Sequence, residues 1–139
     1  MVIMSIDYGD SKTGLAICDK YETLAFPLGV IKETDMASLT EKVAVIAAEN
    51  FARMIVIGYP KNMDGSEGFK AQAIKEFMKL LQDKTDLPLE LWDERLTTVL
   101  AHRFLSENNV RGKNRKGVVD AVAAVIILQD YIEYRKNKI

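Results

Sequence analysis

Short apolar runs separated by turn residues dominate the first part of the chain. Residues 2–6 are rich in β-branched side chains and end at Asp7, and a second apolar run covers residues 14–18 after a turn-like stretch at 9–12. This spacing predicts a buried strand and its partner in a β-hairpin. An acidic side chain at the end of a rigid central strand, where the strand opens onto solvent, is well placed for chemistry.

The next two segments change from a strand pattern to a helix pattern. Residues 24–31 are the third predicted strand, and Pro27 favours an edge position because proline cannot donate a ladder hydrogen bond. Thr34 or Asp35 then offers an N-cap. Apolar residues follow at helical spacing, namely Met36, Leu39, Val43, Ile46 and Ala47.

The middle of the chain predicts a second strand–helix–strand unit. Residues 54–57 are a continuous apolar run, typical of a strand that is covered on both faces. A loop rich in turn residues covers 58–68. Phe69, Ala73, Phe77 and Leu80 mark a second helix, and residues 87–92 alternate with period two, which predicts a last strand.

The last third begins with the polar stretch 93–98 and a predicted helix over 100–105. A loop with several basic residues covers 108–116. The last helix is predicted to begin near Gly117, and residues 118–128 are apolar almost all round except at Asp120, which predicts burial. The basic residues 135–138 are expected to fray.

This order of elements predicts the fold class α/β. Three antiparallel strands come first, and right-handed crossovers then place the fourth strand beside the first and the fifth outside it. The prediction is one five-stranded mixed sheet of order 3-2-1-4-5, with strand 2 antiparallel and helices on both faces. Asp7, the 58–68 loop and the pair Asp93/Glu94 then share the carboxyl edge of the parallel strands, where ligands bind in open α/β sheets.

Composition narrows the functional classes. A chain of 139 residues with 48% hydrophobic residues is expected to form one domain, residues 1–139. The formal net charge of −1 gives no global basic field, so nucleic-acid binding requires local patches. The lone cysteine, Cys18, is expected to be a buried, inert thiol. No leader or membrane-spanning pattern is visible, so a cytoplasmic protein is expected, as a monomer or weak homodimer.

Four motifs in this order resemble the YqgF family, whose members are described as Holliday junction resolvases or as nucleases of pre-16S ribosomal RNA, with a ribonuclease H-like fold. The resemblance covers essentially the whole chain. The motifs are Asp7-Tyr-Gly9 with Gly14, Gly58-Tyr-Pro60 with Asp64-Gly65, Asp93-Glu-Arg-Leu-Thr-Thr98, and Lys116 with Asp120-Ala-Val-Ala-Ala124 and Ile127-Leu128.

The resemblance implies a metal-dependent nuclease whose catalytic residues and metal ligands are Asp7, Glu94 and Asp120. Two Mg²⁺ or Mn²⁺ ions held by carboxylates would activate the water and balance the charge of the leaving oxygen. Asp93 and Glu94 are adjacent and point to opposite faces of an extended segment, so only one is a direct ligand. The resemblance favours Glu94, with Asp93 as the alternative. Taken singly, Asp7 also suits a turn residue and Asp120 a helix-start charge.

Basic residues and glycines supply the remaining candidates. Gly58 and Gly65 allow backbone N–H groups to approach a phosphate, although a tight loop also needs glycine for its own turns. Arg95 offers a planar fork for phosphate, or for an ion pair with Asp93 or Asp64. The predicted contacts with the nucleic-acid backbone are made by Lys12, Arg95, Arg111, Lys113, Arg115 and Lys116.

The favoured substrate is the 5′ end of pre-16S ribosomal RNA, and the alternative is a DNA Holliday junction. Two other functions are weighed. Residues 7–14 also resemble the phosphate-binding hairpin of sugar kinases and actin-like ATPases, but those proteins close two such domains on a nucleotide and this chain has one. A non-catalytic nucleic-acid-binding module is the other, and the intact set of acids argues against it.

Overall fold

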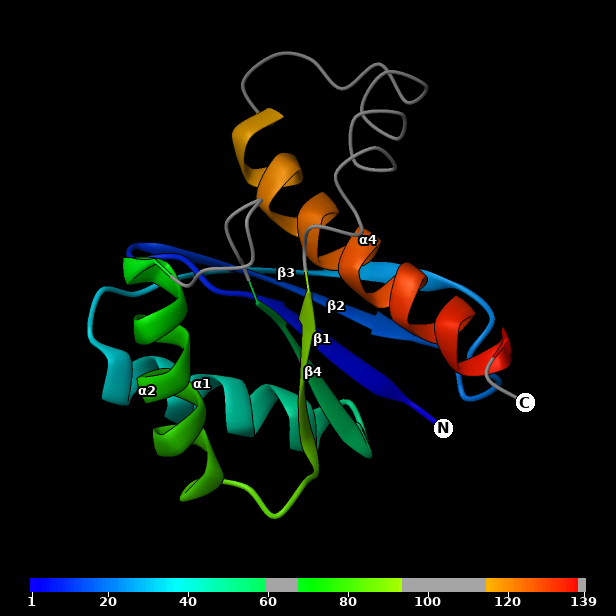
Figure 1. Cartoon of the computed structure of the whole chain (residues 1–139), viewed down its shortest axis with the longest axis horizontal. Helices are drawn as coiled ribbons and strands as arrows, with labels where there is room; N and C mark the ends of the chain where they lie inside the picture. Colours follow the sequence, from blue (N-terminus) through cyan, green and yellow to red (C-terminus); the bar gives the residue numbers. More distant parts are fainter. Residues whose placement is uncertain (60–67, 94–114, 138–139) are drawn as a thin grey trace.

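The five strands form one mixed sheet of order β3-β2-β1-β4-β5 (Figure 1). The computed structural model describes residues 1–59, 68–93 and 115–137, with the side chains of 115–120 excepted. The predicted sheet order is confirmed. The strands are β1 (Ile3–Asp7), β2 (Lys12–Cys18), β3 (Ala25–Lys32), β4 (Met54–Tyr59) and β5 (Leu89–Asp93).

Strand directions also follow the prediction. β2 is antiparallel to β1 and β3, whereas β1, β4 and β5 are mutually parallel. β4 lies inside the sheet and is buried along its whole length, as its continuous apolar run predicts. Pro27 lies in β3 at the edge of the sheet. The hairpin strand begins at Lys12 rather than Gly14, because its pairing with β3 extends to Lys32.

Helices cover both faces, which confirms the predicted layers (Figure 1). α1 (Met36–Glu49) and α2 (Phe69–Gln82) pack on one face, and α4 (Arg115–Asn137) packs on the other. The Asp35 side chain caps α1 by accepting a hydrogen bond from the Ser38 N–H. The helix predicted over 100–105 lies outside the described residues. Within the described part of the chain, no helix has the length and apolar character needed to cross a membrane.

Strand alternation divides the core into two clusters. Met4 and Ile6 of β1 belong to the cluster under α1 and α2, which we call the α1/α2 face. Ile3 belongs to the cluster under α4, and Ser5 bonds α4 directly, so this side is the α4 face. Successive residues of a strand point to opposite faces, and Asp7 therefore lies on the α4 face with Ile3 and Ser5.

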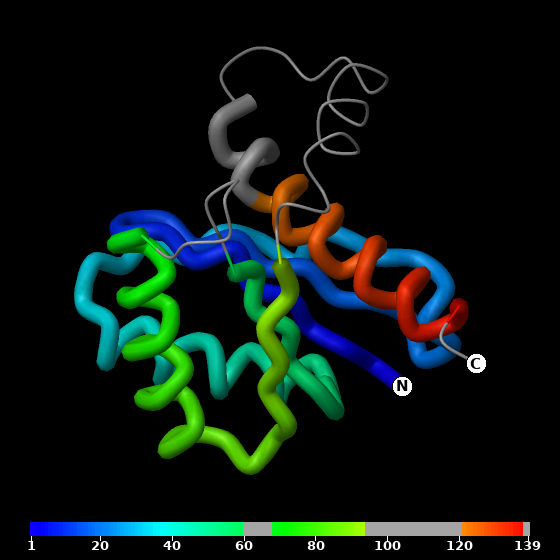
Figure 2. The backbone as a smooth tube through the Cα atoms, viewed as in Figure 1, coloured from blue at the N-terminus to red at the C-terminus, as the bar shows by residue number. Residues whose placement is uncertain are grey.

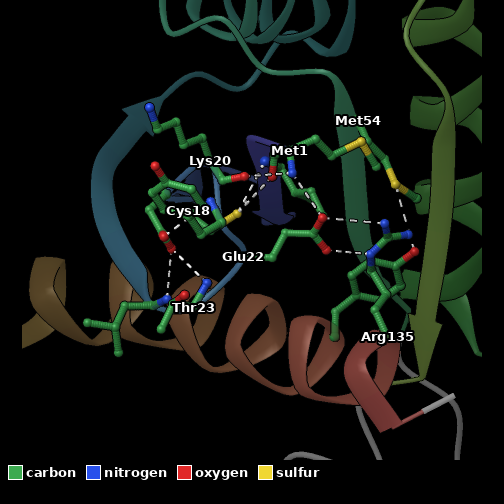
Figure 3. Close-up of polar contacts among 12 residues, drawn as sticks. Met1, Cys18, Lys20, Glu22, Thr23, Met54 and Arg135 are labelled. Atoms are coloured by element: carbon green, nitrogen blue, oxygen red, sulfur yellow. Dashed lines mark hydrogen bonds and ion pairs between the residues drawn. The ribbon is translucent and has the colours of Figure 1, made fainter. Parts of the chain in front are cut away.

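Three hydrogen-bonded contacts fix how α4 lies on the sheet. The buried Ser5 hydroxyl donates to the Ala124 carbonyl at 2.6 Å. Near the middle of α4, the Gln129 side chain accepts from the Ala25 N–H at 2.9 Å. At its end, Arg135 Nε bonds Glu22 at 2.6 Å (Figure 3). The helix therefore runs opposite to β1, with its amino end over the carboxyl end of the parallel strands.

The end of the chain corrects one sequence prediction. Residues 135–138 were expected to fray, but α4 continues through Asn137 and Arg135 is held by Glu22. Glu22 also pairs with the amino group of Met1, so both ends of the described chain lie together (Figures 2 and 3). The local polarity of the sequence did not predict this ordered end, because the partner of Arg135 is 113 residues away. The helix also begins at Arg115, two residues before the predicted start.

Cys18 is buried, as predicted. Its sulfur accepts a hydrogen bond from the Ile3 N–H at 3.3 Å. Burial raises the pKa of the thiol above its ordinary value, which disfavours the reactive thiolate.

Replacing Ser5 tests how α4 is attached to the sheet. Ser5→Ala removes a buried hydrogen bond to the Ala124 carbonyl, so we expect a loss of about 1 kcal/mol in the free energy of unfolding. Chemical denaturation of the purified variants measures this. Ser11→Ala is the control, because Ser11 is exposed and the change is expected to stay within about 0.5 kcal/mol. Equal stability of the parent and Ser5→Ala would contradict the account.

Candidate functional site

A tight turn between β1 and β2 holds Asp7 at the end of the central strand. Asp7 pairs with Gly14 in the ladder. Thr13, which is fully buried, places its hydroxyl 3.4 Å from both the N–H and the carbonyl oxygen of Gly9. A Cβ at Gly9 would meet the Lys12 carbonyl oxygen at 2.1 Å, so only glycine fits there. The turn is therefore built for close backbone approach, and it fixes the strand end.

Tyr8 anchors the strand end from the other face. Its side chain is buried in the α1/α2 cluster, with its ring centroid 5.2 Å from that of Phe77. Burial, with lesser contributions from the charges of Asp10 and Glu76, raises the pKa of Tyr8. Because the Tyr8 side chain points to the α1/α2 face, the side chain of the preceding residue, the half-buried Asp7, points to the α4 face.

The carboxyl edge of the sheet presents a row of residues on the α4 face. Ile6 pairs with Ile57, so Asp7 stands level with Gly58 in β4, and Gly58 pairs with Trp92 in β5. Gly58 contributes no side chain to this row. Gly58 is buried together with the rest of β4, and its contact with a phosphate stays a prediction.

Asp93 lies on the opposite face from Asp7. It pairs with Tyr59, which is buried in the α1/α2 cluster, and Leu91 packs against the same cluster. Trp92 between them packs against the α4 cluster. The pleat thus places Asp93 on the α1/α2 face, away from Asp7, and Glu94 lies outside the described residues.

The backbone of residue 120 lies in α4 one turn before Ala124. Ala124 lies over Ser5, and Asp7 is two residues further along β1 on the same face. Since α4 runs opposite to β1, one turn back along the helix and two residues along the strand both lead toward the carboxyl edge, by about 6 Å and 7 Å respectively. Residue 120 and Asp7 are thus brought to the same end of the molecule.

Only some of the other predicted site residues lie in the described part of the chain. Lys12 begins β2 and Gly58 lies in β4. The backbone of Arg115 and Lys116 forms the start of α4. Within the described residues, no three His, Cys, Asp or Glu side chains gather closely enough to hold a metal ion. The predicted residues that lie outside the described part are Gly65, Glu94, Arg95, Arg111 and Lys113, and the side chain of Asp120 also lies outside it.

Sequence reasoning missed an aromatic cluster behind the row. The Trp92 ring lies 5.7 Å from that of Tyr131 and 5.2 Å from that of Tyr134, centroid to centroid. The Tyr131 hydroxyl donates a short hydrogen bond to the Glu90 carboxylate, and burial followed by this bond raises the pKa of Tyr131 to about 12. The signal was present in the sequence, because Glu90 and Trp92 share the parity of the α4 face.

A hollow of about 640 Å³ lies beside this cluster, at the amino end of the parallel strands. Its lining includes Glu22 and Arg135, which pair with each other, together with Glu90 and Tyr131. Asp7 is at the other end of β1, so this hollow is separate from the predicted site. Of the two places, only the carboxyl edge joins residues that come from separate predicted motifs.

Comparison with known proteins identifies the family of the chain. A family model described as "RuvX: Holliday junction resolvase" matches residues 1–134. A protein of Halothermothrix orenii named "Putative pre-16S rRNA nuclease" is 44% identical over 137 residues, covering 99% of this chain and 98% of the relative. A protein of the same name from Thermoanaerobacter pseudethanolicus is 42% identical over 139 residues, covering 99% and 100%.

Two solved structures share the fold. The RuvC of T. thermophilus, in complex with a Holliday junction substrate, matches with a TM-score of 0.61 at 12% identity and covers 98% of this chain and 96% of its own. The fowlpox virus resolvase, in complex with Holliday junction DNA, matches with a TM-score of 0.59 at 15% identity, covering 97% and 99%. At such identities the likeness shows the ribonuclease H-like fold alone.

The turn before the site gives a direct test. Gly9→Ala places a methyl group 2.1 Å from a backbone carbonyl, so the turn must open and Asp7 must shift. We expect a loss of about 1–3 kcal/mol in the free energy of unfolding, as for other overpacked positions. Ser11→Ala is the control, because Ser11 is exposed in the same turn. Thermal unfolding compares the two variants, and equal melting temperatures would contradict the described turn.

Proposed function

The chain belongs to the RuvX family of Holliday junction resolvases and is a nuclease that hydrolyses phosphodiester bonds, and we propose that its substrate is the 5′ end of precursor 16S ribosomal RNA. The observation that carries the site is the convergence of Asp7 and residue 120 of α4 on one face at one edge of the sheet. We place the catalytic centre there. The residues proposed to form it are Asp7, Glu94 and Asp120.

The donor chemistry of these three residues fits hard divalent cations. Carboxylate oxygens are the ligands that Mg²⁺ and Mn²⁺ prefer, and three acids on separate elements leave open positions for water and substrate. When bound, such ions supply an activated water and a counter-charge for the leaving oxygen. The chain's own part is to hold the carboxylates in place. Gly9 and Tyr8 hold Asp7, and the Ser5–Ala124 bond aligns α4.

Glu94 is proposed as the ligand of the adjacent pair. Asp93 lies on the α1/α2 face with Tyr59, whereas Asp7 lies on the α4 face. A residue that follows Asp93 in an extended segment takes the parity of Trp92 and Asp7. Pleat geometry therefore supports the same choice that the family motif favours.

Ribosomal RNA is preferred over branched DNA because of the relatives. The two relatives described above, 44% and 42% identical over nearly their whole length, carry a name referring to pre-16S rRNA. The structures bound to Holliday junctions are at most 15% identical and support the fold only. A four-way DNA junction remains the second candidate, because the family description names it. Ribosomal RNA processing would place the protein in the cytoplasm.

Backbone contacts are proposed for the basic residues that the sequence predicted. Lys12 lies at the carboxyl edge on β2. Arg115 and Lys116 begin α4, whose amino end lies over the same edge. Arg95, Arg111 and Lys113 complete this proposed set of phosphate contacts.

The metal site is tested with Asp7→Asn and Asp120→Asn. We expect cleavage of precursor 16S rRNA in Mg²⁺ to fall to background in both variants, with circular dichroism unchanged. Added Mg²⁺ should raise the melting temperature of the parent, because binding to the folded state stabilises it, and should raise that of each variant less. Cleavage by both variants at the parent's rate would remove the proposed centre.

The choice within the adjacent pair needs its own comparison. Glu94→Gln should lower kcat/KM by at least about a hundredfold, which corresponds to roughly 2.7 kcal/mol of transition-state stabilisation. Asp93→Asn should stay within about threefold of the parent, less than 1 kcal/mol. The two variants remove one charge each from neighbouring positions and so control for one another. The reverse ranking would assign the ligand to Asp93.

A further inference from the structure

Two lysines face each other across the β2–β3 ladder at the carboxyl edge. Lys12 and Lys32 are direct partners in this antiparallel register. Directly opposed residues have their Cβ atoms roughly 5 Å apart on the same face of a sheet. Lys12 was predicted as a phosphate contact from its loop, but nothing in the sequence pattern pointed to Lys32.

This lysine pair lies on the same face as Asp7. Gly14, two residues along β2 from Lys12, is the ladder partner of Asp7. Thr13 between them pairs with Ile31, which packs against the α1/α2 cluster, so Lys12 and Lys32 take the opposite parity. Two strand residues span about 7 Å. Lys12 is thus two residues beyond the ladder partner of Asp7 on the neighbouring strand, and Lys32 lies one strand further out on the same α4 face.

Within the described residues, neither lysine has an acidic partner. The acid next to Lys32 in sequence, Glu33, is already bound by Lys42 at 2.7 Å and accepts the Asp35 N–H at 3.1 Å. Like charges placed directly opposite each other destabilise a sheet. The free protein therefore carries a local repulsion that a bound anion would relieve.

The backbone holds the lysine pair in place. The ladder extends beyond it, since the Glu33 N–H donates to the Ser11 carbonyl at 3.0 Å. The tight turn at Gly9 fixes the other end of this segment. Lys12 is half-buried and Lys32 is exposed, so both side chains have access to solvent.

We propose that Lys12 and Lys32 together hold one phosphate group of the substrate strand, adjacent to the phosphate that is cleaved near Asp7. This proposal rests on the proposed nuclease function. Lysine binds phosphate as a mobile point charge, and two such charges on one anion replace a mutual repulsion with two attractions. The strand would thereby be positioned along the α4 face, and Lys32 is a positioning residue that contacts the backbone and not a base.

The test measures binding apart from cleavage. Fluorescently labelled single-stranded RNA from the 5′ flank of 16S rRNA and a four-way DNA junction are titrated in EDTA, from low to moderate salt. Lys32→Gln should weaken binding to both probes and should reduce the magnitude of the log–log salt slope by about 0.7 on single strands and 0.9 on duplex arms. Lys20→Gln, a lysine in the turn at the opposite end of β2, is the matched control and should leave the slope unchanged.

A charge reversal separates ligand binding from a structural role. Lys32→Glu places a carboxylate opposite Lys12, so the melting temperature of the free protein should stay level or rise while binding weakens more than in Lys32→Gln. A merely structural lysine would lose stability and binding together.

The outcomes distinguish failure of the lysine-pair proposal from failure of the nuclease function. If the parent cleaves RNA or the junction but both Lys32 variants bind with the parent's affinity and slope, the lysine-pair proposal is overturned and the nuclease stands. If the Lys32 variants bind weakly but the parent cleaves neither substrate, the lysine pair is supported and the nuclease proposal fails. Failure of the parent to bind either probe overturns the lysine pair as well.

Discussion

The seating of α4 on the sheet is the contact on which the proposed centre depends. The buried Ser5–Ala124 hydrogen bond aligns the helix with β1, and the Arg135–Glu22 pair fixes its far end. Because the helix runs opposite to the parallel strands, its amino end must lie over their carboxyl ends. A helix that packed in the other direction would carry residue 120 to the end of the sheet away from Asp7, and the acids could not meet.

A second constraint is the alternation of side chains along the strands. The pleat sends Asp7, Gly58 and Trp92 to the α4 face in one row, and it sends Asp93 to the other. The same parity sets Lys12 and Lys32, on the two neighbouring strands, on the same face as Asp7. Residues from distant parts of the chain are thereby gathered on one face. The carboxyl edge therefore carries an acid and two lysines on one face, although the net charge of the chain is close to zero.

The sheet order could be predicted from the sequence for two reasons. The period of the hydrophobic residues is a local property that identifies each strand and helix, and the right-handedness of crossovers is nearly universal. The right-handed crossovers placed β4 beside β1, and the continuous run in β4 and the proline in β3 favoured an inner and an edge position. Long-range pairings were not predictable in this way. Arg135 was expected to fray because its partner, Glu22, comes from a distant turn, and Lys32 went unnoticed because its importance arises from register with Lys12. Of the site, the motifs supplied Asp7, Glu94 and Asp120, but only the pleat separates Asp93 from Asp7.

The most direct measurement of the central claim is an anomalous-difference map from crystals of this protein grown with Mn²⁺. The account predicts one or two peaks on the α4 face of the sheet, about 2.0–2.3 Å from a carboxylate oxygen of Asp7 and within coordination distance of Asp120, as expected for oxygen ligands of such ions. Asp93 should make no direct bond to the metal. Peaks on the α1/α2 face, or Mn²⁺ bound without Asp7, would contradict the account.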